Sequence, residues 1–225
     1  MIRINNLSKS FGTEQVLKEI DVTFGPGEVH GIVGKNGAGK TTLFRCLCGL
    51  ESYEGEVTPA PKQLKQHLGY LQTEPYTLPL ITGREYIQLL CSSRRLPQVD
   101  IEGKNLFNLP LDKYVTAYST GMRKKLALNA ILLQENEVFI LDEPFNGLDL
   151  ESNIMVTELI QELKKAGKTI ILSSHIFSTL TGVCDEIHFL EDGSFSGHYK
   201  QDQFAELEEE MRQKVVGQSI KGLIK

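Results

Sequence analysis

The stretch GIVGKNGAGKTT, from Gly31 to Thr42, decides the fold of this 225-residue chain. Glycine occupies four of its first nine positions, although each glycine costs backbone entropy on folding. A glycine-rich loop can turn several backbone N–H groups inward and lead into a helix, whose first N–H groups are unpaired and whose dipole is positive there. Residues 34–41 match the pattern G-x-x-x-x-G-K-[ST], which predicts a phosphate cradle.

The sequence on both sides of this loop agrees with phosphate binding. Residues 28–33, EVHGIV, predict a short buried strand before the loop, and a helix-like stretch follows it. The alternative is a tight strand-to-helix turn that carries a lysine by chance. We expect Lys40 to reach the β- and γ-phosphates, Thr41 to ligate Mg²⁺ and Thr42 to lie beside the α-phosphate. The expected nucleotide-binding residues of the loop are Gly34, Lys35, Asn36, Gly37, Ala38, Gly39, Lys40, Thr41 and Thr42.

The composition fits one folded α/β domain, with 40% hydrophobic and 24% charged residues. The net charge of −5, from 24 basic and 29 acidic residues, argues against nucleic acid as a partner. No apolar run approaches the roughly 18 residues of a spanning helix, and the polar first ten residues predict no secretory signal. Any membrane role is therefore expected to come through a partner protein.

The hydrophobic pattern predicts a mostly parallel sheet covered by helices. Continuous apolar segments at 68–72, 137–144 and 168–175 indicate buried strands. Helices are predicted at 82–93, where Thr82 and Glu85 have capping-box spacing, from Ser119 or Thr120 to 134, and at 151–167, ending at Gly167. A hairpin is predicted around Asp192–Gly193.

We therefore predict an α/β fold: a P-loop NTPase core with a mostly parallel sheet, an N-terminal antiparallel β-subdomain and an inserted helical subdomain. Alternating apolar residues in 2–11 and 16–24 indicate the antiparallel strands. Residues 1–225 form a single domain in this interpretation, residues 73–134 are the helical insertion, and residues 200–225 are a C-terminal surface helix.

Two adjacent carboxylates, Asp142 and Glu143, end the apolar run VFIL. Such a pair is costly unless a cation or proton neutralises it, and a P-loop enzyme needs a carboxylate at a neighbouring strand end to hold Mg²⁺. Asp142 fits that role, and Glu143 is placed to polarise a water that attacks the γ-phosphate. The alternative is a strand end that simply faces solvent.

Taken together, these motifs resemble the ATP-binding subunits of ABC transporters, in the family's order and over almost the whole chain. Gly34 to Thr42 match the Walker A loop, and Asp142 and Glu143 match Walker B. The remaining matches are Gln72 with the Q-loop glutamine, Tyr118 to Met122 (YSTGM) with the signature, Asn146 to Asp149 with the D-loop, His175 with the switch histidine and Phe11 with the adenine-stacking aromatic.

The resemblance implies a role for each matched residue. Gln72 would ligate Mg²⁺ or the attacking water, and His175 would donate a hydrogen bond to the γ-phosphate. Ser119 and Gly121 of the signature would contact the γ-phosphate bound by a second subunit, and Asp149 would couple the two sites. The chain departs from the usual LSGGQ signature, since Thr120 replaces a glycine and Met122 replaces the glutamine, which puts the turnover rate in doubt.

The resemblance also implies the mechanism and the partners. Two subunits, as a homodimer or heterodimer, would sandwich two ATP molecules and reopen after hydrolysis, powering an integral membrane permease. The chain would then be cytoplasmic and peripheral on the inner face of the membrane. The sequence YSTGMRKK resembles signatures of single-domain subunits of bacterial exporters, which favours export. The alternatives are a soluble ABC-type ATPase that acts in assembly or regulation, and a nucleotide-binding regulator without useful hydrolysis.

Other chemically versatile residues receive a structural interpretation. The cysteines complete no zinc pattern and are interpreted as small apolar residues in a reducing compartment. The basic run Arg123, Lys124 and Lys125 can be a solvated helix face. The residues interpreted as structural are Cys46, Cys48, Cys91, Cys184, His30, His67, His188 and His198.

Overall fold

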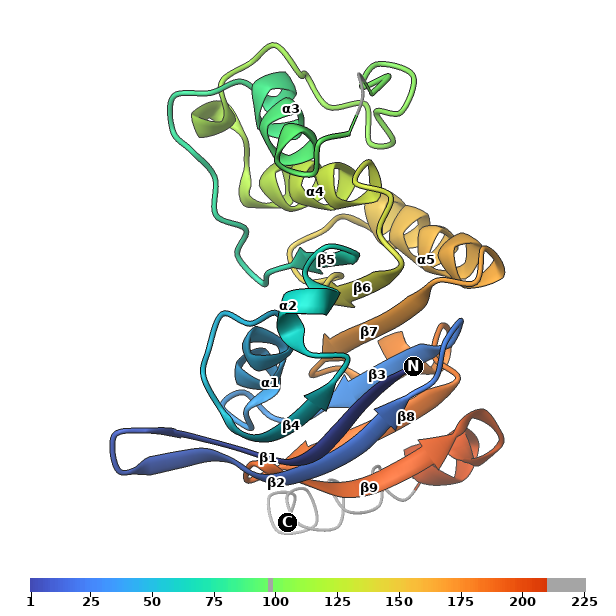
Figure 1. Cartoon of the computed structure of the whole chain (residues 1–225). Coiled ribbons are helices and arrows are strands. Elements are labelled where there is room, and N and C mark those ends of the chain that lie inside the picture. Colours follow the sequence, from blue (N-terminus) through green and yellow to red (C-terminus); the bar gives the residue numbers. More distant parts are fainter. Residues whose placement is uncertain (97–98, 210–225) are drawn as a thin grey trace, which may run out of the picture.

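The computed structural model describes residues 1–96 and 99–209 (Figure 1). A six-stranded sheet runs through the centre in the order β5-β6-β7-β3-β8-β9, with only the β8–β9 pair antiparallel. The predicted mostly parallel sheet is thus confirmed. Its strands are β3 (Val29–Val33), β5 (Leu68–Leu71), β6 (Val138–Leu141), β7 (Thr169–Ser174), β8 (Glu186–Glu191) and β9 (Ser194–Lys200).

The second sheet is antiparallel, as predicted for the N-terminal region, and has the order β2-β1-β4. It consists of β1 (Ile2–Phe11), β2 (Glu14–Phe24) and β4 (Glu54–Thr58). The sequence analysis did not identify β4, in which Val57 alone is buried. A strand with one buried side chain carries almost no periodic apolar signal.

The helices lie around the central sheet in positions that fit the predicted segments. The capping box predicted from Thr82 and Glu85 is present, with both reciprocal hydrogen bonds, and Gly167 takes a φ of 76° just after the last long helix. The helices are α1 (Lys40–Leu47), α2 (Pro61–Leu64), α3 (Gly83–Ser93), α4 (Thr120–Leu132), α5 (Leu150–Lys165) and α6 (Phe177–Thr181), with 3₁₀ turns at Val115–Ala117 and Gln201–Gln203.

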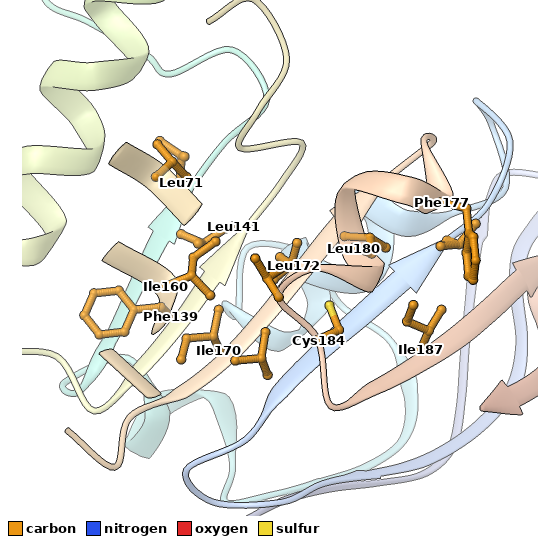
Figure 2. Packing of buried hydrophobic residues seen from close by; sticks show 14 of the residues in the cluster. Leu71, Phe139, Leu141, Ile160, Ile170, Leu172, Phe177, Leu180, Cys184 and Ile187 are labelled. Carbon is orange, nitrogen blue, oxygen red and sulfur yellow. The ribbon is translucent and has the colours of Figure 1, made fainter. Parts of the chain in front are cut away.

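Buried side chains form cores on both faces of the central sheet. On one face, side chains of β6, β7 and β8 pack with Ile160 of α5 and with Leu180 of α6 (Figure 2). On the other face, α1 and the antiparallel sheet cover side chains such as Ile32 and Ile171. Burial on both faces explains why these strands are apolar at consecutive positions.

A third core holds α3 and α4 together, and it includes Ile87, Leu126 and Ala130. The segment 73–134 is less helical than predicted, because residues 94–96 and 99–114 form turns and loops. The loop at 99–114 contains isolated apolar residues such as Leu109 and Leu111, which are buried in this core although they do not follow a helical spacing. The proposed limits of a helical subdomain stay a prediction.

The C-terminal tail is described only as far as residue 209. Residues 204–209 are helical. Phe204 and Leu207 are buried in the core that also contains Ile160 of α5 and Leu180 of α6. The rest of the predicted helix, residues 210–225, lies outside the described residues. Among the helices that the structure describes, none is long and apolar enough to cross a membrane.

Candidate functional site

The glycine-rich loop connects β3 to α1 at the carboxyl end of the central sheet. β3 lies between β7 and β8, so the loop emerges from the middle of the sheet. Gly39 precedes α1 with a φ of 108°, which favours glycine. A Cβ atom at Gly34 would lie 2.4 Å from the Leu190 main-chain oxygen. Both positions therefore require glycine for the backbone to follow this path.

Lys40 lies at the centre of this loop and is only 7% exposed. Its Nζ donates hydrogen bonds to the main-chain oxygens of Gly34, at 2.7 Å, and Lys35, at 3.2 Å. The same Nζ lies 3.7 Å from Oε1 of Glu143. The loop thus holds one positive charge beside the start of α1, and positive charge at a helix start favours phosphate oxygens.

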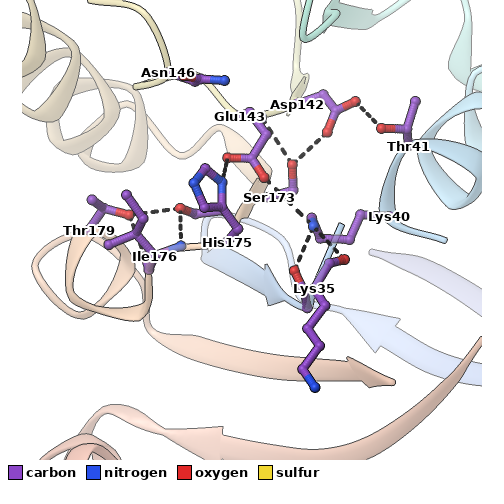
Figure 3. A network of polar contacts seen from close by, with 12 residues as sticks. Lys35, Lys40, Thr41, Asp142, Glu143, Asn146, Ser173, His175, Ile176 and Thr179 are labelled. Atoms are coloured by element: carbon purple, nitrogen blue, oxygen red, sulfur yellow. Dashed lines mark hydrogen bonds and ion pairs between the residues drawn. The ribbon is translucent and has the colours of Figure 1, made fainter. Parts of the chain in front are cut away.

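Asp142 follows the last residue of β6 and is fully buried. Its Oδ2 accepts a hydrogen bond from the Thr41 hydroxyl at 2.6 Å, and its Oδ1 accepts one from the Ser173 hydroxyl at 2.6 Å (Figure 3). The fold therefore brings together the hydroxyl and the carboxylate that the sequence predicted as magnesium ligands. Hydroxyl and carboxylate oxygens are donors that suit Mg²⁺.

Glu143 takes a φ of 50°, an uncommon conformation for a residue with a side chain. Three contacts hold it there. Its N–H donates to Ser173 Oγ at 3.0 Å, and its Oε2 lies 2.9 Å from Nδ1 of His175 (Figure 3). Its main-chain oxygen accepts from Lys124 Nζ at 2.9 Å. Left-handed residues fixed by their surroundings are common at active sites. The carboxylate is consequently held between His175 and Lys40.

These groups surround one hollow of about 340 Å³. Its wall combines the glycine-rich loop, the ends of β6 and β7, and residues from β2 and from the chain after β5. The lining residues are Val16, Asn36, Gly37, Gly39, Lys40, Thr41, Thr42, Thr73, Asp142, Glu143, Asn146 and His175. An adjoining hollow of about 550 Å³ is lined by Gly34, Lys35, Ala38 and His175, among others. The two hollows together flank the loop.

Two predicted site residues lie outside the central hollow. Gln72 lines a separate hollow of about 260 Å³ between the sheet and the helices α3 and α4, whereas the next residue, Thr73, lines the central one. Phe11, at the end of the β1–β2 hairpin, is 47% exposed, and its ring packs under Lys9 Nζ at 4.6 Å. Val16 from β2 is the apolar residue that lines the central hollow.

The signature residues Ser119 and Gly121 lie at the start of α4, also outside the central hollow. Ser119 caps this helix by accepting a hydrogen bond from Met122 N at 3.2 Å. Gly121 lies against the chain after β6, where an added Cβ would be 2.8 Å from the Gly147 main-chain oxygen. The capped helix end is therefore packed directly against the segment that carries Asn146 and Asp149.

Sequence reasoning missed two buried polar residues that build this site. Ser173 binds both Asp142 and Glu143, and a polar residue within an apolar strand was its only signal. Lys124 was grouped with a solvated helix face, and this interpretation is wrong for that residue, because Lys124 is 2% exposed. Its Nζ donates to the main-chain oxygens of Glu143 and of Asn146, the latter at 2.7 Å.

Comparison with known proteins places these features in a family. Residues 17–146 match the family model described as ABC transporter. An ABC transporter ATP-binding protein of Nostoc sp. is 34% identical over 79% of this chain, and the chain spans 57% of that relative. NatA, an ABC transporter ATP-binding protein of Bacillus subtilis, is 31% identical, with 86% of this chain and 87% of NatA covered.

Another relative is the lantibiotic transport ATP-binding protein SrtF of Streptococcus pyogenes. It is 30% identical, with 93% of this chain and 95% of SrtF covered. Among solved structures, a dimeric ATP-binding cassette in a post-hydrolysis state with ADP and Pi superposes with a TM-score of 0.80. The two sequences are 21% identical, and the match covers 89% of this chain and 99% of the cassette. At this identity the match supports the fold alone.

Proposed function

This chain belongs to the ABC transporter family as an ATP-binding ATPase subunit, and we propose that it powers a membrane exporter through ATP-dependent dimerisation. The observation that carries the proposal is the continuous polar network around Glu143. A lysine of the phosphate loop, the strand-end carboxylates and His175 all meet at one hollow. These are the groups that a phosphoryl-transfer reaction with water requires.

We assign the binding of the nucleotide to the phosphate loop. Lys40 and the backbone N–H groups of residues 34–42 would hold the β- and γ-phosphates. Thr41 and Asp142 would hold Mg²⁺, with Gln72 as a further ligand, and the ion would neutralise charge on the transferring phosphoryl group. Phe11 would stack on the adenine, and Val16, which lines the hollow, would add an apolar contact.

For hydrolysis, we assign the activation of water to Glu143. Its carboxylate is held between Lys40 and His175, so that it is oriented before substrate binds. His175 would contact the γ-phosphate while it keeps the carboxylate in place. Ser173 and Lys124 act as positioning residues, because they fix the backbone of Glu143 without facing the hollow.

The case for dimerisation rests on the signature residues, which do not line the hollow of their own chain. Ser119 and Gly121, at the capped end of α4, would face the nucleotide of a second subunit, where N–H groups at a helix start favour phosphate. The superposed cassette is described as a dimer. Members of this family work with membrane permease subunits, and the hollow that contains Gln72, beside α3 and α4, is our candidate for the contact with one. The chain would then be held on the inner face of the membrane.

Two observations favour export among the transport functions. The signature YSTGMRKK resembles that of single-domain exporter subunits, and one relative that covers nearly the whole chain is named for lantibiotic transport. The second candidate function, a soluble ABC-type ATPase in assembly or regulation, has the same hydrolytic site and differs in its partner.

The experiment that tests the proposal traps the closed dimer. Tagged Glu143→Gln protein is expressed in its native cell, membranes are solubilised gently with Mg-ATP, and co-purifying proteins are identified. A stoichiometric multi-span membrane protein supports the transporter function, and a Glu143→Gln, Lys40→Ala double variant should lose it. Soluble partners alone would favour the second candidate. Hydrolysis by Glu143→Gln at the wild-type rate would overturn the assignment of Glu143.

A further inference from the structure

A second group of polar side chains lies on the central sheet, apart from the phosphate loop; His30 and His188 in it are buried, whereas the His198 side chain is 48% exposed. The group consists of His30 in β3, Glu186 and His188 in β8, and His198 in β9. The sheet register pairs His30 with Glu186 and His188 with His198. Glu186 and His188 are two residues apart on one strand, so both side chains point to the same face. Phe24 of β2 covers this face, with ring centroids 5.1 Å from His30 and 5.7 Å from His188.

Two nitrogen atoms in this cluster are buried without a hydrogen-bond partner, namely Nδ1 of His30 and Nε2 of His188. The two residues are 0% and 4% exposed. Buried polar atoms are nearly always paired, so each exception requires an explanation such as a bound ion. Two such atoms within one cluster therefore point to a ligand that both can contact.

The other ring nitrogen of His30 also lies beside hydrogen-bond acceptors. Nε2 lies 3.4 Å from the main-chain oxygen of Gly25 and 3.3 Å from Oε2 of Glu28, and both are acceptors. The tautomer that carries its proton on Nε2 donates to these acceptors and leaves a lone pair on Nδ1. That lone pair faces Oε2 of Glu186 at 3.6 Å. Two electron-rich atoms that face each other in a buried place are stabilised by a cation between them.

We propose that Nδ1 of His30, a carboxylate oxygen of Glu186 and Nε2 of His188 bind a divalent transition-metal ion of the Zn²⁺ class. Each of the three residues offers one ligand atom, and these three atoms all lie within 4.8 Å of one another. At Zn²⁺ bond lengths of about 2.0–2.1 Å, ligand atoms are about 3.3 Å apart, so closure needs shifts of about 1 Å. Two imidazoles and one carboxylate suit Zn²⁺ and leave a fourth position for water, whereas Mg²⁺ prefers oxygen ligands.

The surroundings of the cluster suit neutral histidine ligands. Burial lowers the pKa of His30, and burial together with His198 and His30 lowers the pKa of His188 to about 3. A lowered pKa favours the neutral imidazole, which is the form that binds metals. The contacts of His30 Nε2 with Gly25 and Glu28 are the outer contacts that orient metal-bound imidazoles. His198 Nε2, 3.0 Å from Glu186 Oε2, orients the carboxylate in the same way.

The ion would reach this site from the surface without passing the nucleotide site. Glu186 and Glu28 also line an open hollow of about 630 Å³ on the molecular surface. Lys200 Nζ, 3.9 Å from Glu186 Oε1, is a competing cation, but it is 67% exposed and can remain on that outer oxygen. Metal bound here would join β3 to β8, and β3 leads directly into the phosphate loop.

The test measures metal uptake by the full chain. Metal-free wild-type protein in excess Mg²⁺ is titrated with Zn²⁺ by calorimetry and with Co²⁺ by visible absorption. We expect one equivalent of each ion to bind, with a Co²⁺ spectrum of a four-coordinate nitrogen and oxygen site. At a Zn²⁺ concentration 100 times Kd, the Tm should rise by ~5 °C, because the ion binds only the folded state.

Matched variants assign the uptake to this cluster. His188→Asn and Glu186→Gln should lose the equivalent and the Tm rise, whereas His67→Asn, which changes an exposed histidine, should retain both. Glu186→Gln preserves the shape of the side chain and decides the matter if His188→Asn fails to fold. Absence of uptake by the wild type, or equal uptake by Glu186→Gln and wild type, would overturn the proposal. The inference does not depend on the transport function.

Discussion

The ammonium group of Lys124 donates hydrogen bonds to the main-chain oxygens of Glu143, at 2.9 Å, and Asn146, at 2.7 Å. Lys124 belongs to α4, the helix whose first turn carries the signature, and Glu143 carries the carboxylate of the proposed hydrolytic site. The lysine is buried, and this burial lowers its pKa. The Lys124 side chain thus connects α4, which carries the signature, to the loop that carries Glu143. A movement of α4 would therefore shift this loop, and a movement of the loop would shift α4.

We predict that Lys124→Met destabilises the protein and slows hydrolysis. The substitution keeps most of the side-chain volume but removes the lysine donor from the Asn146 oxygen and leaves the Glu143 oxygen with the Asn146 N–H as its donor, which costs about 1–3 kcal/mol. The free energy of unfolding from urea titration and the kcat for ATP would measure the two effects. Lys125→Met is the matched control, because Lys125 makes a surface pair with Asp149 at 2.9 Å and should matter much less. Equal losses in the two variants would contradict the role of Lys124.

Ser173→Ala should weaken the magnesium site. Ser173 Oγ donates to Asp142 Oδ1 and accepts from Glu143 N, so its removal leaves a buried carboxylate oxygen and a buried N–H group unpaired. We expect a loss of about 1–3 kcal/mol in stability and a higher Mg²⁺ concentration for half-maximal ATPase activity. Ser178→Ala, at an exposed serine just beyond the same strand, is the control and should leave the Mg²⁺ dependence unchanged.

Gly121→Ala should disturb the start of α4. The new Cβ would lie 2.8 Å from the Gly147 main-chain oxygen, so either the helix or the loop must shift. Overpacking of this kind costs about 1–3 kcal/mol. We expect ATP-dependent dimerisation, measured by gel filtration of the Glu143→Gln background, to weaken, while ATP binding to the monomer persists. Gly182→Ala, where a Cβ meets no atom within 4 Å, should dimerise normally.

Asp149 should make stability depend on pH in the acid range. Hydrogen bonds from Ser152, and then from Lys125, lower the pKa of its carboxyl well below the ordinary value. Because the folded pKa lies below the unfolded value of about 3.9, the charge stabilises the fold above that pH and loses its effect as the pH falls through the folded pKa.

The corresponding measurement compares wild type with Asp149→Asn, which keeps a helix-capping side chain but removes the charge. We expect the wild type to have a Tm a few °C higher at neutral pH, and the difference to shrink below about pH 4. A difference that grows on acidification would contradict the assigned direction of the pKa shift.

The fold was largely predictable because its strongest signals are local. Strands buried on both faces give continuous apolar runs, and the glycine-rich loop needs its residues at fixed positions, so β3, β6, β7 and α1 were recognised from sequence. β4 was missed because a strand with one buried side chain has no pattern of its own. The segment 99–114 was predicted to be more helical than it is. Packing against α3 and α4 holds its apolar residues in loops, so their burial does not require helical periodicity.

Which residues meet in the site depends on sheet order more than on sequence. The sequence by itself determined the phosphate loop, the two carboxylates at a strand end and their order along the chain, because backbone conformation and charge require these residue types in close succession. Only the tertiary structure decided that Thr41 binds Asp142 across 101 positions, that Lys124 is buried below Glu143, and that His30, Glu186 and His188 share one face. Contacts between neighbouring strands depend on register, and no local pattern encodes the register of strands that lie far apart in the chain.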